Sequence, residues 1–133
     1  MKIARTNEQL IQRFESGVLE ADSFHHADHV RLGFAYLSKY PTLQALERFS
    51  ASLKEFANVH GKATLYNETV TYAYIFLIRE RMARSGVNDW EEFAQANPDL
   101  LIWKGGVLGC YYREVTLQSE LARRIFLFPD KCW

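Results

Sequence analysis

The amino-acid sequence predicts an all-α fold: a compact bundle of about five to six helices that forms a single domain over residues 1–133. Capping residues, Gly and Pro divide the chain into segments with short connections, which favours antiparallel neighbours. No convincing stretch alternates apolar and polar residues as a strand would. Apolar residues recur at helical spacing, most clearly in Leu43, Leu46, Phe49, Leu53 and Phe56.

The first two helices are defined by capping residues and helix breakers. Thr6 begins a capping box, and Gly17 ends the first helix. Asp22 or Ser23 is expected to cap the second helix. This helix stops at Pro41, because a proline disfavours helical conformation in the residue before it.

The third and fourth helices have the clearest boundaries. Thr42 is expected to cap the third, which carries the apolar stripe and ends near His60. The fourth is expected over residues 67–85 and ends at Gly86. It is nearly apolar on all sides through Ile78, which indicates a central position in the bundle or a subunit interface.

The C-terminal third has a weaker pattern. Asn88 is expected to cap a fifth helix, with Glu91 at the capping-box position. The glycine-rich stretch WKGGVLGCYY is expected to form a loop with short helical turns. Thr116 is expected to cap a last helix over residues 117–126, stopped by Pro129.

Charge and hydropathy narrow the class of protein. The chain is neutral, with 16 Lys and Arg against 16 Asp and Glu, so it lacks the basic surface of a nucleic-acid binder or of a protein held on anionic membranes by charge. Its longest apolar run, YAYIFLI, is too short to span a bilayer, and its N-terminus has no apolar leader core. Cys110 and Cys132 match no metal or redox pattern. We therefore expect a soluble cytoplasmic protein with reduced thiols.

Three of the four histidines, His25, His26 and His29, lie in the stretch FHHADHV. On a helical wheel His26 and His29 fall inside the apolar arc, His25 lies at its edge, and Asp28 points to solvent. A buried imidazole without a partner costs about 1–3 kcal/mol. A metal ion would be a suitable partner, because neutral imidazole is a common metal ligand. Tyrosine hydroxyls and backbone carbonyls of a polar core are the alternative.

Glu68, at the polar start of the fourth helix, is the carboxylate expected to complete a site. His26, His29 and Glu68 would form a ligand set of two histidines and one carboxylate, which suits iron with open positions or catalytic zinc. Glu68 and His25 are the candidate catalytic groups, since a His/Glu pair can also act as general acid and base without a metal. The alternative is that Glu68 only favours the helix dipole.

Seven further residues are candidates for the wall of a pocket. The helix dipole would also favour His60 at a helix end, and Asn67 is also a good N-cap. Lys104 could meet an anionic ligand. The candidates are His60, Tyr66, Asn67, Thr71, Tyr74, Trp103 and Lys104.

The segments FHHADHVRLGFAYL, LYNETVTYAYIFLI and NPDLLIWKGGVLGCYYREVTLQSELARRIFLFPD resemble a family of small uncharacterised bacterial proteins. The family pattern pairs an F-H-H-x-x-H-[VIL]-R-L helix with a Y-[HN]-E-T-[VIL]-T helix, matched here at residues 24–32 and 66–71, and the resemblance extends from Phe24 to Asp130. If the family often has a histidine at the position of Asn67, one possible ligand is weakened in this chain. The resemblance implies a bacterial protein and supports the choice of site residues, but it implies no reaction.

Two functions are consistent with these residues. The first is a metal-dependent enzyme acting on a small molecule; iron or copper would imply oxidation, and zinc or manganese would imply hydrolysis or lyase chemistry. The second is a non-catalytic protein that binds a small ligand or forms a homodimer. A weaker third is a protein–protein adaptor with an exposed aromatic patch. Convergence of His26, His29 and Glu68 around a cavity would favour the enzyme, whereas capping by tyrosines and carbonyls would favour a structural core.

Overall fold

The computed structural model describes residues 6–19 and 24–131. Within these ranges it contains helices and no strand, so the all-α prediction is confirmed. The 3-10 helices are η2 (Ala63–Leu65), η3 (Pro98–Leu101) and η4 (Val107–Cys110). The α-helices are α1 (Asn7–Glu15), α2 (His26–Lys39), α3 (Thr42–Val59), α4 (Glu68–Ser85), α5 (Trp90–Ala96), α6 (Glu114–Leu117) and α7 (Glu120–Arg124).

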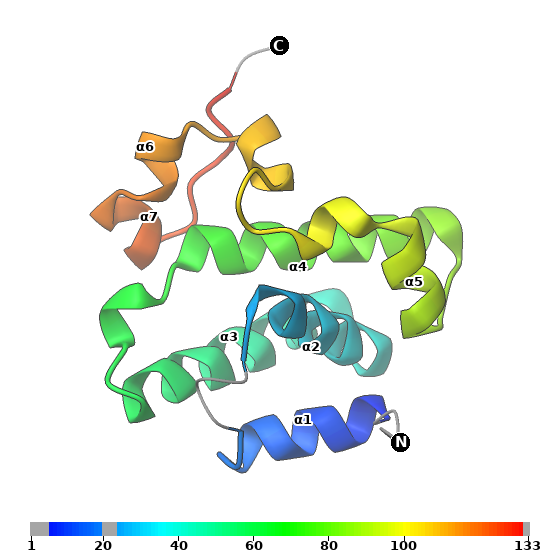
Figure 1. The fold of residues 1–133 in the computed structure, drawn as a ribbon. Helices are drawn as coiled ribbons and strands as arrows, with labels where there is room; N and C mark the ends of the chain where they lie inside the picture. Colours follow the sequence, from blue (N-terminus) through cyan, green and yellow to red (C-terminus); the bar gives the residue numbers. More distant parts are fainter. Residues whose placement is uncertain (1–5, 20–23, 132–133) are drawn as a thin grey trace.

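Helix α4 has the central position that its apolar sequence predicts (Figure 1). It packs against α2, α3 and α7, while α2 also contacts α1, α3 and η3. The segment with α6 and α7 lies on the opposite side of α4 from α1 (Figure 1). The largest fully buried side chains include Phe34 and Tyr36 on α2 and Ile75 and Ile78 on α4, so the core lies where these two helices meet.

Gly33 allows α2 and α4 to approach closely. A Cβ atom at this position would lie 3.2 Å from Cδ1 of Ile78 and 3.3 Å from Cδ1 of Ile75. A helix interior normally disfavours glycine by about 1 kcal/mol relative to alanine, so its presence here reflects packing rather than propensity.

Local capping confirms several predicted helix ends. Thr6 and Gln9 form the predicted capping box of α1. The side chain of Asn67 accepts a hydrogen bond from Val70 N at 3.0 Å, which makes it the N-cap of α4. Gly86 ends α4 with φ of 69°, a left-handed conformation that glycine adopts without strain.

The starts of three other helices differ from the prediction by one or more residues. The predicted caps Asp22 and Ser23 lie outside the described residues; α2 begins at His26 with the extended residue His25 as its N-cap. Pro41 is the N-cap of α3, and Thr42 is already helical. Asp89 caps α5 in place of Asn88, because its carboxylate accepts the hydrogen bond from Glu92 N at 3.1 Å.

The predicted last helix over residues 117–126 is instead two short helices, α6 and α7. The side chain of Ser119 accepts from Ala122 N at 3.1 Å and starts α7 as a separate helix. Ile125 is extended, with φ of −136° and ψ of 163°, and ends α7 one residue before Phe126. The weak apolar pattern of this segment did not indicate the break at Ser119.

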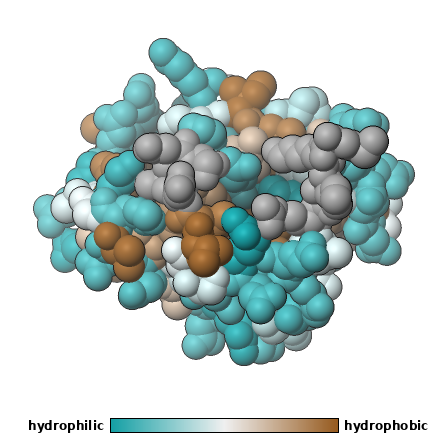
Figure 2. All heavy atoms as spheres, turned by 60° about the horizontal axis from the view of Figure 1, so that its bottom comes forward, coloured by the Kyte–Doolittle hydropathy of each residue, from teal (hydrophilic) through white to brown (hydrophobic). Residues whose placement is uncertain are grey.

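No described helix combines the length and hydropathy that crossing a bilayer requires. The face that carries α1 is mainly hydrophilic outside the grey atoms, with apolar side chains in small groups (Figure 2). Aromatic side chains are exposed elsewhere: the ring of Phe126 packs between Tyr72, Phe76 and Phe128, and Phe128 is 82% exposed. A homodimer or adaptor that uses this aromatic group stays a prediction.

Candidate functional site

His25 is the extended residue before α2, so its predicted place at the edge of the apolar arc of that helix is wrong. Its backbone N–H donates to Oδ2 of Asp28 at 2.9 Å, which satisfies one of the free N–H groups at the start of α2. Asp28, which was predicted to point to solvent, thus stabilises the start of the helix. The side chain of His25 is exposed, so this candidate catalytic group lies at the surface.

His26 joins α2 to η3. Its Nε2 atom lies 2.9 Å from the carbonyl oxygen of Leu100. A carbonyl oxygen only accepts, so Nε2 carries the proton and Nδ1 keeps its lone pair. The ring also contacts Tyr74, with centroids 4.8 Å apart, and Trp103, with centroids 5.3 Å apart. Burial lowers the pKa of His26, and the hydrogen bond to Leu100 partly opposes this shift.

His29 belongs to a row of aromatic rings. Its ring lies against Phe24 with centroids 4.1 Å apart; Phe24 contacts Phe56 at 4.9 Å, and Phe56 contacts His60 at 4.5 Å. Burial, and to a smaller extent the neighbouring His26, lowers the pKa of His29 to about 4. His29 is therefore neutral at pH 7. His60 lies at the other end of this aromatic row, at the C-terminus of α3.

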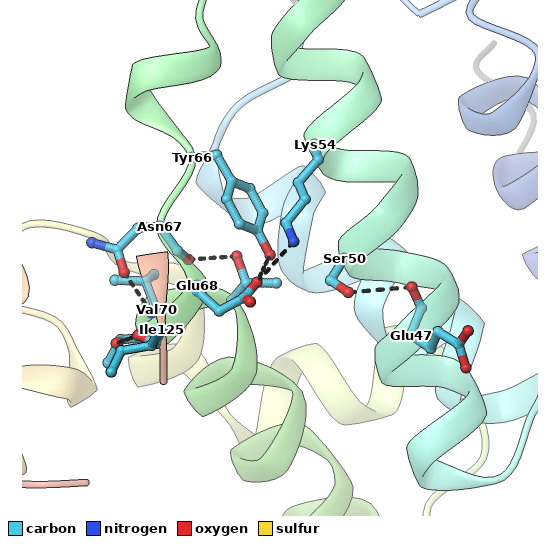
Figure 3. A network of polar contacts seen from close by, with 10 residues as sticks. Glu47, Ser50, Lys54, Tyr66, Asn67, Glu68, Val70 and Ile125 are labelled. Carbon is cyan, nitrogen blue, oxygen red and sulfur yellow. Dashed lines mark hydrogen bonds and ion pairs between the residues drawn. The ribbon is translucent and has the colours of Figure 1, made fainter. Parts of the chain in front are cut away.

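Glu68 forms a polar cluster with a different set of residues (Figure 3). Its Oε1 atom accepts a hydrogen bond from the hydroxyl of Tyr66 at 2.6 Å and lies 3.4 Å from Nζ of Lys54 on α3. The side chain of Glu68 is only 14% exposed, whereas that of Lys54 is 53% exposed. Burial raises the pKa of Tyr66, and the Glu68 carboxylate raises it further. The Tyr66 hydroxyl thus stays protonated and remains a donor.

The other polar residues of YNETVT hold the fold together. Asn67 Nδ2 donates to the carbonyl oxygen of Leu117 at 2.7 Å. The hydroxyl of Thr69, which is fully buried, donates to Ile125 O at 2.8 Å. The hydroxyl of Thr71 donates to Asn67 O at 2.8 Å. Asn67 and Thr71 were predicted as pocket residues, but their polar side-chain groups form hydrogen bonds within the fold.

The predicted ligands do not form one cluster. His26 lies beside η3, whereas Glu68 lies beside Lys54 on α3. Across residues 6–19 and 24–131, no three His, Cys, Asp or Glu side chains are close enough to hold a metal ion together. Whether His26 and His29 bind a metal stays a prediction.

Three predicted pocket residues, Tyr74, Trp103 and Lys104, lie near His26. Tyr74 is 6% exposed, and burial, aided by the charge of Asp99, raises its pKa to about 12. Within the described part of the chain, its hydroxyl has no hydrogen-bond partner. Trp103 is 55% exposed, and Lys104 is exposed beside it.

A groove with a volume of about 440 Å³ runs along α3 beside η2. Two of its wall residues, Lys54 and Tyr66, are the partners of Glu68. The full lining consists of Ala51, Lys54, Glu55, Asn58, Ala63 and Tyr66.

The sequence pattern indicated Tyr66 as a pocket residue but did not indicate Lys54, Glu55 and Asn58. One signal was available: Ala51, Lys54, Glu55 and Asn58 recur at helical spacing and share one face of α3, opposite its apolar stripe. A polar helix face is normally solvated, and only the position of η2 makes this one a groove wall.

Comparisons of the chain with protein-family models, with curated proteins and with solved structures find no match. The candidate chemistry therefore follows from the groups themselves. The cluster offers a protonated phenol, a largely buried carboxylate and a half-exposed ammonium at the edge of a groove. Such groups can hold a small polar molecule by charge and hydrogen bonding and can exchange one proton with it.

Proposed function

We propose that the protein binds a small polar organic molecule in the groove between α3 and η2, with Glu68 and Tyr66 as its polar anchors and Lys54 beside them. The observation that carries the proposal is the position of Glu68. A carboxylate that is 14% exposed is held by two residues that both line the groove. Ligand sites typically combine a concave volume of some hundreds of Å³ with a few convergent polar groups, which is the combination present here.

The test is a screen of small polar compounds against the whole chain by NMR, with binding mapped from backbone amide shifts. We expect binders that perturb Lys54, Asn58 and Tyr66. An Ala51→Trp variant should lose this binding, because the indole would fill the groove from an exposed position on α3. Ala96→Trp is the matched control, since Ala96 is also exposed on a helix and does not line the groove.

Two outcomes would count against the groove. One is a screen in which no compound perturbs its lining residues. The other is a compound that binds the Ala51→Trp variant as tightly as the wild-type chain, which would locate the binding elsewhere.

A metal-dependent enzyme is the second candidate function, favoured by the tautomer of His26. Histidine ligands commonly donate their second ring N–H to a backbone carbonyl, as His26 does to Leu100, and this leaves Nδ1 available for a metal. His29, three residues along the same helix, is neutral and therefore also able to act as a ligand. Iron, zinc, copper and manganese are the ions to test.

Elemental analysis of the tag-free protein tests this candidate. The expected result is near-stoichiometric metal in the wild-type chain and its loss in a folded His26→Ala/His29→Ala variant. A His25→Ala/His60→Ala variant is the matched control and should keep the metal. Wild-type protein that remains metal-free after incubation with all four ions would eliminate this candidate and leave the groove proposal unaffected.

A further inference from the structure

The side chains of two tyrosines, Tyr66 and Tyr72, lie near the carboxylate of Glu68. Tyr66 donates to it at 2.6 Å. Tyr72 lies four residues further along α4, on the same helix face, and the Glu68 carboxylate contributes, after burial, to its raised pKa. A carboxylate beside aromatic rings is the arrangement with which proteins recognise organic ammonium ions.

The side chain of Lys54 already occupies the space next to the Glu68 carboxylate. Nζ of Lys54 lies 3.4 Å from Glu68 Oε1 and 5.3 Å from the centroid of the Tyr66 ring (Figure 3). The lysine ammonium therefore makes an ion pair and a cation–π contact at once. With 53% of its side chain exposed, Lys54 can turn into solvent without opening the core.

The charges around the groove also favour a cation. Among the described residues that line the groove, Lys54 is the only cationic one; Glu55 also lines it, and Glu68 pairs with Lys54. A ligand anion bound at Lys54 would come close to both carboxylates. A ligand ammonium that displaced Lys54 would gain the contacts that the lysine makes now.

We infer that the groove recognises a small organic amine in its ammonium form, and that Lys54 occupies the ammonium position until the ligand displaces it. This inference rests on the proposed groove function and gives it a ligand class. Glu68 pairs with the ligand ammonium, the Tyr66 ring covers it, and the rest of the ligand extends along Asn58 and Ala63. Lys54 acts as an internal competitor, so removing its charge strengthens binding.

The test compares two probes of equal length and opposite charge, butylammonium and butyrate, titrated into the whole chain at constant ionic strength. Amide and tyrosine ring resonances report binding at the groove. We expect butylammonium to shift Tyr66 and Ala63. Its affinity should rise roughly three- to fivefold in Lys54→Met, because an exposed ion pair no longer competes. It should fall about tenfold or more in Glu68→Gln, which loses the paired charge.

Lys39→Met is the matched control. Lys39 also pairs with a carboxylate, Glu8, at 3.5 Å and lies 5.5 Å from the centroid of a tyrosine ring, that of Tyr40, but it is remote from the groove lining. Its replacement should leave the affinity for butylammonium unchanged. Lys54 is half exposed, so the Lys54→Met result is decisive even if Glu68→Gln does not fold.

Two results would overturn the inference and are distinguishable. Butyrate binding at the groove that Lys54→Met abolishes, without butylammonium binding, would make Lys54 an anion site and leave the proposed groove function intact. Shifts from neither probe, together with an empty compound screen, would overturn both the amine inference and the groove function.

Discussion

The imidazole of His26 donates from Nε2 to the carbonyl oxygen of Leu100 at 2.9 Å and thereby joins α2 to η3 across 74 residues of chain. Leu100 is itself fully buried. The same imidazole packs edge-on against Tyr74 of α4. One side chain therefore connects α2, η3 and α4.

Replacing His26 by alanine should lower the free energy of unfolding by about 1–3 kcal/mol, because the Leu100 carbonyl loses its donor next to buried apolar groups. His26→Gln should recover part of the loss, since its amide N–H₂ can donate over a similar distance. Urea denaturation measures both values. Equal stability of the alanine variant and the wild-type chain would show that this hydrogen bond contributes nothing to the fold.

Protonation of His29 should destabilise the protein in mildly acidic solution. Its pKa is about 4 in the folded chain and near the ordinary 6.5 in the unfolded chain, so between these values the unfolded chain binds a proton that the folded chain does not. The stabilisation from neutral His29 is therefore complete above pH 6.5 and is lost as pH falls towards 4, by about 3 kcal/mol. The lowered pKa of His26 acts in the same direction.

Denaturation at a series of pH values measures this effect. His29→Leu should flatten the dependence between pH 6.5 and 4, while the exposed His25→Gln should retain it. The lowered pKa values of Asp99 and Asp130 affect a more acidic range, below 3.8. An unchanged slope in His29→Leu would assign the acid sensitivity to another group.

The sequence predicted the helices well where the signals are local. The apolar stripe of α3, the capping box at Thr6 and the cap at Asn67 all depend on residues within one or two turns. The start of α2 and the division of the last helix at Ser119 were missed. At both places several polar residues in succession can serve as a cap, and tertiary contacts select among them.

The candidate site was predictable only in part, for a related reason. Tyr66 and Glu68 are two residues apart, so their pairing lies within one motif. Lys54 reaches Glu68 from another helix, and Leu100 meets His26 from η3, which is distant in the sequence. The helical wheel correctly placed His26 towards the interior, but periodicity within one helix carries no information on which groups of other helices will face it.

Thr69 should be essential for holding the C-terminal segment on α4. Its hydroxyl donates to Ile125 O at 2.8 Å and accepts from Leu127 N at 3.1 Å, and the residue is fully buried. Thr69→Val keeps the shape and removes both bonds, so we expect a loss of about 1–3 kcal/mol and faster hydrogen exchange at the Leu127 amide. Thr69→Ser keeps the hydroxyl and should protect that amide. Similar exchange in both variants would contradict the role of the hydroxyl.

Two buried tyrosines should respond oppositely to loss of the hydroxyl. Tyr112 is 2% exposed and donates to Leu127 O at 2.6 Å. Tyr74 is 6% exposed, and its hydroxyl is buried without a hydrogen-bond partner among the described residues. Tyr112→Phe should therefore lower the free energy of unfolding by about 1–2 kcal/mol. Tyr74→Phe should leave it unchanged or raise it by up to about 1 kcal/mol, because a desolvated polar group is removed.

Each variant is the control for the other, since both substitutions remove one oxygen atom from a buried ring and change nothing else. Urea denaturation at neutral pH, well below the pKa of about 12 of Tyr74, keeps that phenol protonated. If Tyr74→Phe is destabilised as much as Tyr112→Phe, the Tyr74 hydroxyl has a hydrogen-bonding partner in solution. A polar group would then lie between Tyr74 and its neighbours. If the imidazole of His26 holds that group, Tyr74→Phe should no longer destabilise a chain that already carries His26→Ala.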